Sequence, residues 1–349
     1  MDSEAGFDDI CETDGDVEES SFEHYRFVSD KGQALTRVDK FITARMEQTS
    51  RHKIQLAIGV GYVRVNDRVV KANYLVKPDD IITILLPYRR RGFELSPENI
   101  PLDIPYEDDD LLIVNKPAGL VVHPGHGHFS GTLVNGLAYH LGINRPEDER
   151  MGILVHRIDK NTSGLLLVAK SEESQLFLAK QFFEHTIERK YLALVWGDVK
   201  EQSGTITGNI GRDPNDRIRF KVFPDSSAGK YAVTHYTVVE RFGYTTLIEC
   251  RLETGRTHQI RVHADYMGHP LFNDEKYGGD RVIKGALYAK YRKFVENCFE
   301  IMPRHALHAK TLGFTHPKTG KKLLFETDPP EDFKAVMEKW RNFSRHQAL

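Results

Sequence analysis

The strongest constraint on how this chain folds is a run of nine mostly polar residues followed at once by an apolar run. Residues 156–164 read His-Arg-Ile-Asp-Lys-Asn-Thr-Ser-Gly, and residues 165–169 read Leu-Leu-Leu-Val-Ala. The apolar run has the length and composition of a buried strand. Polar groups at the lip of such a strand are held rigidly at a surface, where binding and catalytic residues concentrate. We therefore expect a functional site at this strand end.

Asp159 is the carboxylate of this segment, and it lies between Arg157 and Lys160. Opposite charges within reach favour the ionised form of a carboxyl group. An ionised, oriented aspartate serves as a nucleophile or as a general base. A structural ion pair at a turn explains the same spacing equally well, so the residues alone leave both interpretations open.

Residues 156–164 closely resemble the catalytic motif of the RluA/RluD family of pseudouridine synthases. That motif usually reads His-Arg-Leu-Asp, two variable residues and Thr-Ser-Gly-Leu; Ile158 is a conservative replacement for its leucine. The resemblance implies that Asp159 is the catalytic aspartate. It also implies that the remaining motif side chains surround the substrate, namely Arg157, Thr162, Ser163 and Gly164.

A second motif, residues 188–197, reads Glu-Arg-Lys-Tyr-Leu-Ala-Leu-Val-Trp-Gly. In the resembling family its tyrosine, here Tyr191, stacks on the target uracil and takes part in proton transfer. A base taken out of its helix loses stacking and needs an aromatic surface in return. Without the first motif, a strand tyrosine facing the core would be the better interpretation.

A third motif, residues 252–263, contains Gly-Arg-Thr-His-Gln-Ile-Arg, which is similar to the family's Gly-Arg-x-His-Gln-Ile-Arg. By resemblance Arg261 pairs with the catalytic aspartate. A local bridge to Asp265, four residues on, is the competing explanation. We expect Thr257 to cap the helix that follows. The same motif supplies three expected contacts to the substrate or the motif loop: Arg256, His258 and Gln259.

A fourth element, residues 304–309, reads Arg-His-Ala-Leu-His-Ala and resembles another family segment. Its leucine, here Leu307, is expected to pack against the base and Tyr191. An apolar wall beside Asp159 also lowers the local dielectric and strengthens an ion pair with Arg261.

Residues 33–87 read as a compact α/β unit with two short helices and alternating strands. The order resembles an S4 RNA-binding domain, and Val-Arg-Val-Asn-Asp at 63–67 is close to that family's Val-x-Val-Asn-Gly. Phosphate contacts from basic side chains give affinity and register. In the resemblance those side chains are Arg37, Arg45, Arg51 and Lys53, although a solvated helix face would look the same.

Charge divides the chain unevenly. Residues 1–25 hold ten acids and no Lys or Arg, which leaves 48 basic against 40 acidic residues in the rest. The body is therefore basic, as suits a polyanionic partner. The acidic segment has few apolar groups to bury, and we expect it to be disordered. We hypothesise that it competes with RNA for the basic surface.

Mixed strands and interspersed helices predict an α+β fold, not a doubly wound parallel sheet. The resemblance implies a long mixed, mainly antiparallel sheet with flanking helices and a cleft across its middle. The expected division is an acidic tail at 1–30, an S4-like domain at 31–92, a linker at 93–105 and the catalytic domain at 106–349.

Several classes of protein are disfavoured. Three distant cysteines fit neither a disulfide framework nor a zinc site, and they suit a reducing cytoplasm. No apolar stretch is long enough to span a bilayer. The alternating histidines at 123–128 have no fixed tetrahedral geometry, and no phosphate-binding glycine fingerprint occurs, so we expect neither a metal nor a nucleotide cofactor.

The sequence as a whole predicts a cytoplasmic, monomeric RNA pseudouridine synthase whose implied substrate is large-subunit ribosomal RNA. A non-catalytic RNA-binding ribosome-assembly factor of the same fold is the main alternative, and the four intact motifs argue against it. A glycoside hydrolase is a third possibility. It usually needs two placed carboxylates, and Glu253, in the third motif, gives weak support for a second one.

Overall fold

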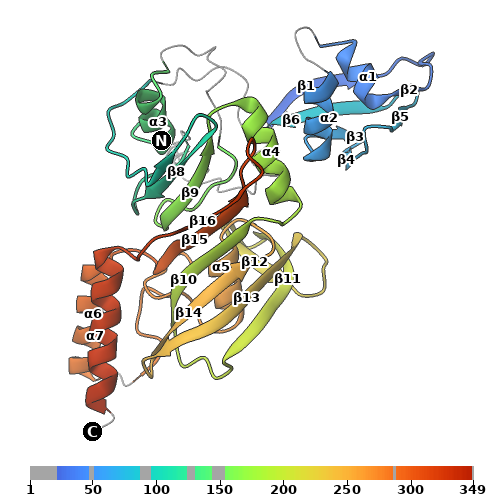
Figure 1. Cartoon of the computed structure of the whole chain (residues 1–349). Helices are drawn as coiled ribbons and strands as arrows, with labels where there is room; N and C mark the ends of the chain where they lie inside the picture. Colours follow the sequence, from blue (N-terminus) through green and yellow to red (C-terminus); the bar gives the residue numbers. More distant parts are fainter. Residues whose placement is uncertain are drawn as a thin grey trace, which may run out of the picture.

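The computed structural model describes residues 22–46, 51–86, 96–123, 130–143, 154–285 and 288–347. They form a small N-terminal unit and a larger unit built on one long sheet (Figure 1). Most of the acidic segment lies outside these described residues.

The N-terminal unit is an S4-type α/β fold. Its elements are β1 (Phe22–Val28), β2 (Thr36–Arg37), α1 (Val38–Thr43), α2 (Arg51–Gly59), β3 (Val63–Val65), β4 (Arg68–Val69), β5 (Leu75–Val76) and β6 (Ile81–Leu86). The main sheet has the order β1-β6-β3-β4. The β3–β4 turn places Asn66 and Asp67 at φ values of 50° and 63°, the left-handed conformation that tight hairpins require.

Strand β1 begins earlier than the sequence analysis placed this unit. It pairs antiparallel with β6, for example Phe27 with Ile82. The predicted boundary at residue 31 was therefore too late. The error has a simple cause: β1 is stabilised by pairing with a strand more than fifty residues away, which local composition cannot reveal.

The segment predicted as a linker has neither helix nor strand over residues 96–105, yet it is fixed to α3 (Leu133–His140). The Asn135 side chain donates to the Ser96 carbonyl at 2.8 Å, and the Glu98 amide donates to the Asn135 carbonyl at 3.1 Å. A Thr132 capping box with Asn135 starts the helix. The segment therefore packs on the larger unit.

The larger unit holds a ten-stranded sheet in the order β12-β11-β13-β14-β10-β15-β9-β8-β7, with β16 paired to β15. Its strands are β7 (Tyr106–Glu107), β8 (Leu111–Lys116), β9 (Ser163–Ala169), β10 (Glu188–Trp196), β11 (Ser203–Asp213), β12 (Asp216–Phe223), β13 (Lys230–Arg241), β14 (Thr245–Leu252), β15 (Leu307–Thr315) and β16 (Lys322–Glu326). Among the described strands of this sheet, only β9 and β15 pair in parallel. The predicted α+β class with a mainly antiparallel sheet is confirmed.

Helices cover both faces of this sheet: α3, α4 (Glu172–Phe183), α5 (Gln259–Tyr266), α6 (Ala289–Ile301) and α7 (Glu331–Gln347). Alternation along β10 shows the two faces. Tyr191, Ala193 and Val195 belong to the core that includes α3 and α5, whereas Leu192 and Trp196 belong to the core under α6 and α7. Tyr191 is thus placed on the same face as α5.

Candidate active site

Asp159 lies on the loop that leads into β9, at the strand end where the sequence predicted a site. The Thr162 amide donates to the Asp159 carbonyl at 3.0 Å and closes a turn. The buried ammonium of Lys116, at the end of β8, donates to three backbone carbonyls, including that of Lys160 at 2.9 Å. These bonds fix the backbone around Asp159 from the neighbouring strand.

The rest of the loop is bound to β15. Thr162 Oγ1 lies 2.9 Å from His305 Nε2, and Ser163 Oγ lies 3.0 Å from His308 Nδ1. Gly164 has a φ of 110°, and a Cβ there would lie 2.2 Å from a backbone oxygen of β15, so glycine is required. Thr162 lines the cavity described below, whereas Ser163 and Gly164 lie behind it and contact the protein.

Arg261, in the first turn of α5, joins two carboxylates. Its Nη1 donates to Asp159 at 2.9 Å, and its Nε and Nη2 donate to both oxygens of Asp274 at 2.8 and 2.9 Å. Burial opposes the Arg261 charge, but Asp274 and Asp159 raise the pKa of Arg261 above its usual value. The predicted pair with Asp159 is present. Among the described residues no bridge joins Arg261 to Asp265: the donors of Arg261 go to Asp159 and Asp274, and Asp265 lies 3.8 Å from Arg219.

Asp274 is fully buried and was missed by the sequence analysis. Its Oδ1 accepts the Tyr277 amide at 3.2 Å, and the Tyr277 hydroxyl lies 2.8 Å from His258 Nδ1. The Arg261 guanidinium is 5.1 Å from the centre of the Tyr277 ring. No local pattern identifies Asp274 or Tyr277, because the loop after α5 brings them beneath Arg261 only in the folded chain.

Tyr191 faces the same cavity from β10 and is 7% exposed. Burial raises the pKa of Tyr191, the Asp159 carboxylate adds to this effect, and Arg189 opposes it. The phenol is therefore neutral at pH 7. Leu307, at the start of β15, also lines the cavity, so an apolar side chain and an aromatic ring stand near the carboxylate.

The loop before α5 is organised by Gln259. Its Oε1 accepts from the Thr254 hydroxyl at 2.7 Å and from the Arg256 amide at 2.9 Å, and its Nε2 donates to β13. The expected Thr257 cap is absent: His258 is the N-cap residue at a φ of 52°, with no side-chain cap. The side-chain amide of Gln259 stabilises the loop in place of a hydroxyl cap.

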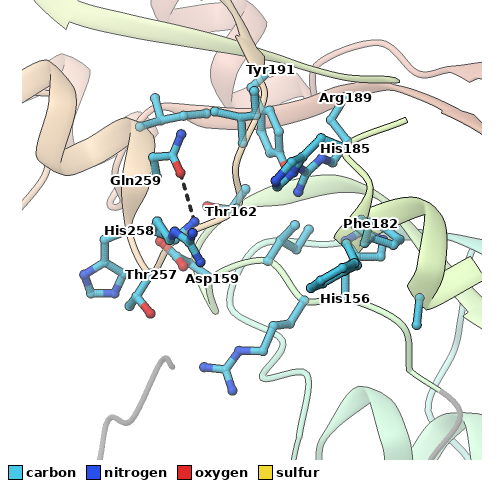
Figure 2. Close-up of a pocket in the computed structure, with 18 of the residues that line it drawn as sticks. His156, Asp159, Thr162, Phe182, His185, Arg189, Tyr191, Thr257, His258 and Gln259 are labelled. Carbon is cyan, nitrogen blue, oxygen red and sulfur yellow. Dashed lines mark hydrogen bonds between the residues drawn. The ribbon is translucent and has the colours of Figure 1, made fainter. Parts of the chain in front are cut away.

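These residues line a cavity of about 340 Å³, shown in Figure 2. Tyr191 and Arg189 lie along one side of it and Asp159 along another. The lining has a strong charge asymmetry: its described residues include five arginines and one carboxylate, that of Asp159. The arginines are Arg64, Arg157, Arg189, Arg256 and Arg261. Such a positive concave surface favours an anionic ligand.

The N-terminal unit carries a second basic group. Arg37 and Arg51 both bind the buried Asp39 at 2.9 Å, which fixes two predicted RNA-binding cations side by side. Burial opposes ionisation of Asp39, but bonds from Arg37, Gln55 and Arg51 lower its pKa. Arg45 is exposed and lies 3.6 Å over the Phe41 ring. The predicted Lys53 lies in α2, and its side chain is outside the described residues.

One cluster among the described residues has the makeup of a metal site: Asp108, Asp110 and His316. The amides of residues 318 and 319 donate to His316 Nδ1, so Nε2 carries the hydrogen and donates to Asp108 at 2.9 Å. Asp108 also accepts two backbone amides. Hydrogen bonds therefore account for this cluster. Two of the histidines predicted not to bind metal, His126 and His128, lie outside the described residues.

Comparisons with known sequences agree with this site. The family described as RNA pseudouridylate synthase matches residues 110–266, and the S4 domain family matches residues 36–82. An RNA pseudouridine synthase of Chlorobaculum parvum is 45% identical, covering 89% of this chain and 96% of that protein. Ribosomal large subunit pseudouridine synthase D of Nitrosomonas europaea is 42% identical, covering 88% of this chain and 85% of that protein. The chain belongs to the RNA pseudouridine synthase family.

Solved structures show the same fold. Human RNA Pseudouridylate Synthase Domain Containing 1 is 25% identical, with a TM-score of 0.51, and the match covers 71% of this chain and 90% of that one. The protein is therefore an isomerase that acts on uridine in RNA, with an S4 domain at its N-terminus. In the described part of the chain no helix has the length and apolar character needed to cross a membrane.

Proposed function

We propose that this enzyme converts uridines of large-subunit ribosomal RNA to pseudouridine, with Asp159 as the catalytic residue. The relative from Nitrosomonas europaea, which is named as a ribosomal large subunit enzyme, supports this substrate because its similarity extends over both domains. The excess of arginine over carboxylate in the cavity lining supports a polyanionic ligand.

The reaction breaks the bond between uracil N1 and ribose C1′, turns the base and rejoins it through C5. The hydrogen leaves C5 and one returns at N1, so the product is an isomer and needs no redox partner or group donor. Asp159 supplies the carboxylate that acts on the ribose. Arg261 holds that carboxylate ionised and placed, and Tyr191 and Leu307 provide faces for the base.

A single observation carries the assignment of Asp159: its contact with Arg261, whose other donors are fixed by buried Asp274. A guanidinium held by two donors on one edge has little freedom to move, so the third donor, Nη1, positions the Asp159 carboxylate at the cavity wall. Carboxylates placed in this way by a fixed cation are suited to act on a reacting centre without reorganisation.

The test is pseudouridine mapping on unmodified large-subunit ribosomal RNA incubated with wild type or Asp159→Ala. We expect modified positions with the wild type alone, and RNA affinity of the variant within a few-fold of wild type. Substantial product from the variant would refute the role of Asp159. Tight binding without product from either protein would support the assembly-factor alternative.

We further propose that the enzyme is a cytoplasmic monomer. Cys250 and Cys298 are buried free thiols, and burial raises the pKa of each to about 12, which suits a reducing compartment and an unreactive thiol. Light scattering on the purified protein should give the mass of one chain. A mass of two chains at micromolar concentration would contradict the monomer.

A further inference from the structure

Arg189, on β10, is a buried cation that the mechanism above does not use. It is 7% exposed and lines the cavity, and its Nε has no hydrogen-bond partner. Among the described residues no carboxylate pairs with Arg189. Its guanidinium carbon lies 5.2 Å from the centre of the Phe182 ring. A buried charge without a partner is costly, so such a residue is retained where a ligand supplies the opposite charge.

The backbone leaves space for this guanidinium. A Cβ at Gly255 would lie 2.7 Å from Arg189 Nη1, so the glycine before the third motif's arginine lets the charged group approach the loop. Figure 2 shows Arg189 beside His185, on the same side of the pocket as Tyr191. An anion bound by Arg189 would therefore lie next to the ring that faces the base.

A second cavity arginine comes from the other domain. Arg64 lies on β3 of the S4 domain, and Tyr62, just before β3, lines the same cavity. This placement is fixed by packing: Val60 and Tyr62 form one buried cluster with Leu176 and Ala179 of α4. The S4 domain is therefore packed against the cavity wall and not only connected through the chain.

The α2–β3 connection adapts to this contact. Gly61 has a φ of 76°, and a Cβ there would lie 3.1 Å from the Phe183 ring at the end of α4. A larger residue would strain the backbone and press on Phe183 at once. Gly61 thus allows the close approach that brings Arg64 to the cavity.

We propose that Arg189 and Arg64 bind backbone phosphates flanking the target uridine, so that the S4 domain forms one wall of the catalytic cavity. The inference rests on the proposed function, because the anion is taken to be the phosphate of the substrate RNA. Phosphates are the anions that RNA brings to any site where a single base is drawn out. One domain then contributes the catalytic aspartate, and both domains hold the strand.

The experiment measures binding of a fluorescently labelled, unmodified large-subunit RNA transcript to the full chain over a range of salt concentrations. Arg189→Gln and Arg64→Gln should each weaken binding about tenfold and reduce the salt slope by about one. Arg68→Gln removes the same charge from an exposed position on β4, outside the cavity, and should change affinity less than twofold.

Stability separates ligand binding from a structural role. Because Arg189→Gln removes an unpaired buried charge, its melting temperature should equal or exceed that of wild type. An Arg189→Gln variant whose melting temperature is several degrees lower and whose RNA affinity is unchanged would overturn the assignment. If Arg64→Gln has the same RNA affinity and salt slope as Arg68→Gln, the proposal that the S4 domain forms one wall of the cavity is overturned. If Arg189→Gln forms pseudouridine more slowly but binds RNA with an unchanged salt slope, Arg189 contacts the base and not a phosphate.

Failure of the proposed function is recognised separately. If the wild type forms no pseudouridine but both arginine variants lose affinity and salt dependence as expected, the phosphate site is supported and the isomerase assignment on this RNA fails. If the wild type forms pseudouridine and neither variant changes binding, the isomerase assignment is supported and the phosphate site fails.

Discussion

Asp274 is expected to act as a positioning residue, and Asp274→Asn is the sharpest perturbation of the site. The substitution keeps the side-chain shape but places an amide NH₂ against a guanidinium donor. In the wild type, Asp274 accepts two bonds from Arg261 and is fully buried. Among the described residues, the variant leaves Arg261, with 8% side-chain exposure, with Asp159 as its only carboxylate partner.

Removing one partner of a buried ion pair costs about 3–5 kcal/mol of unfolding free energy. Asparagine retains one acceptor oxygen for the Tyr277 amide, so we expect the free energy of unfolding to decrease by about 3 kcal/mol, the lower end of that range. At roughly 2–4 °C per kcal/mol for domains of 150–250 residues, the melting temperature should fall by roughly 6–12 °C. Arg261 then moves, and a misplacement of about 1 Å at Asp159 lowers the rate roughly 100-fold.

The assay combines thermal unfolding with single-turnover pseudouridine formation at a temperature where the variant is folded. We expect kcat to fall and KM to stay within a few-fold, because Asp274 does not reach the cavity. Glu275→Gln, an exposed neighbour, is the matched control and should behave as wild type. A folded Asp274→Asn with the wild-type kcat would refute the positioning argument, whatever its melting temperature.

Three further predictions follow from the contacts described above. Arg261→Lys should lower kcat at least tenfold in single-turnover assays, because one ammonium cannot bridge Asp159 and Asp274; near-normal rates would contradict the bridge. In the folded chain, burial lowers the pKa of His156 to about 3, from an ordinary value of 6.5. As the pH falls below 6.5, the unfolded chain therefore takes up a proton at His156 and the folded chain does not, so the free energy of unfolding decreases. Measured by urea unfolding, the free energy of unfolding of the wild type should decrease by about 2 kcal/mol more than that of His156→Gln between pH 7.5 and pH 5. Equal decreases would exclude a lowered pKa of His156 in the folded chain. Deleting residues 1–20, which hold nine acids and leave β1 intact, should tighten RNA binding at low salt; unchanged affinity would reject the competition hypothesis.

Local sequence was sufficient for the elements whose pattern is set within a few residues. The apolar run after Gly164 is strand β9, with all seven residues of the strand buried. The resemblance of the motifs to the family indicated that Asp159, Tyr191 and Arg261 belong to one site, although 102 residues separate the carboxylate from the arginine.

The groups that hold this site in place were decided by tertiary structure. The positioning roles of Asp274, Lys116 and His305 could not be predicted from local sequence, because each binds a motif residue outside its own segment. The prediction that Thr257 caps α5 was wrong for a related reason. A distant strand, β13, binds Gln259 and fixes the loop, so the local rule for caps was overridden.

The sequence by itself determined the chemistry, because reactive side chains must be of given types at given spacings. Only the folded chain decided the electrostatics. A cation or a phenol has its protonation state set by burial and by neighbours, and those neighbours come from the loop before β9, from β10 and from the loop after α5. The same holds for Arg64, whose place in the cavity wall depends on how α2 and β3 pack against α4.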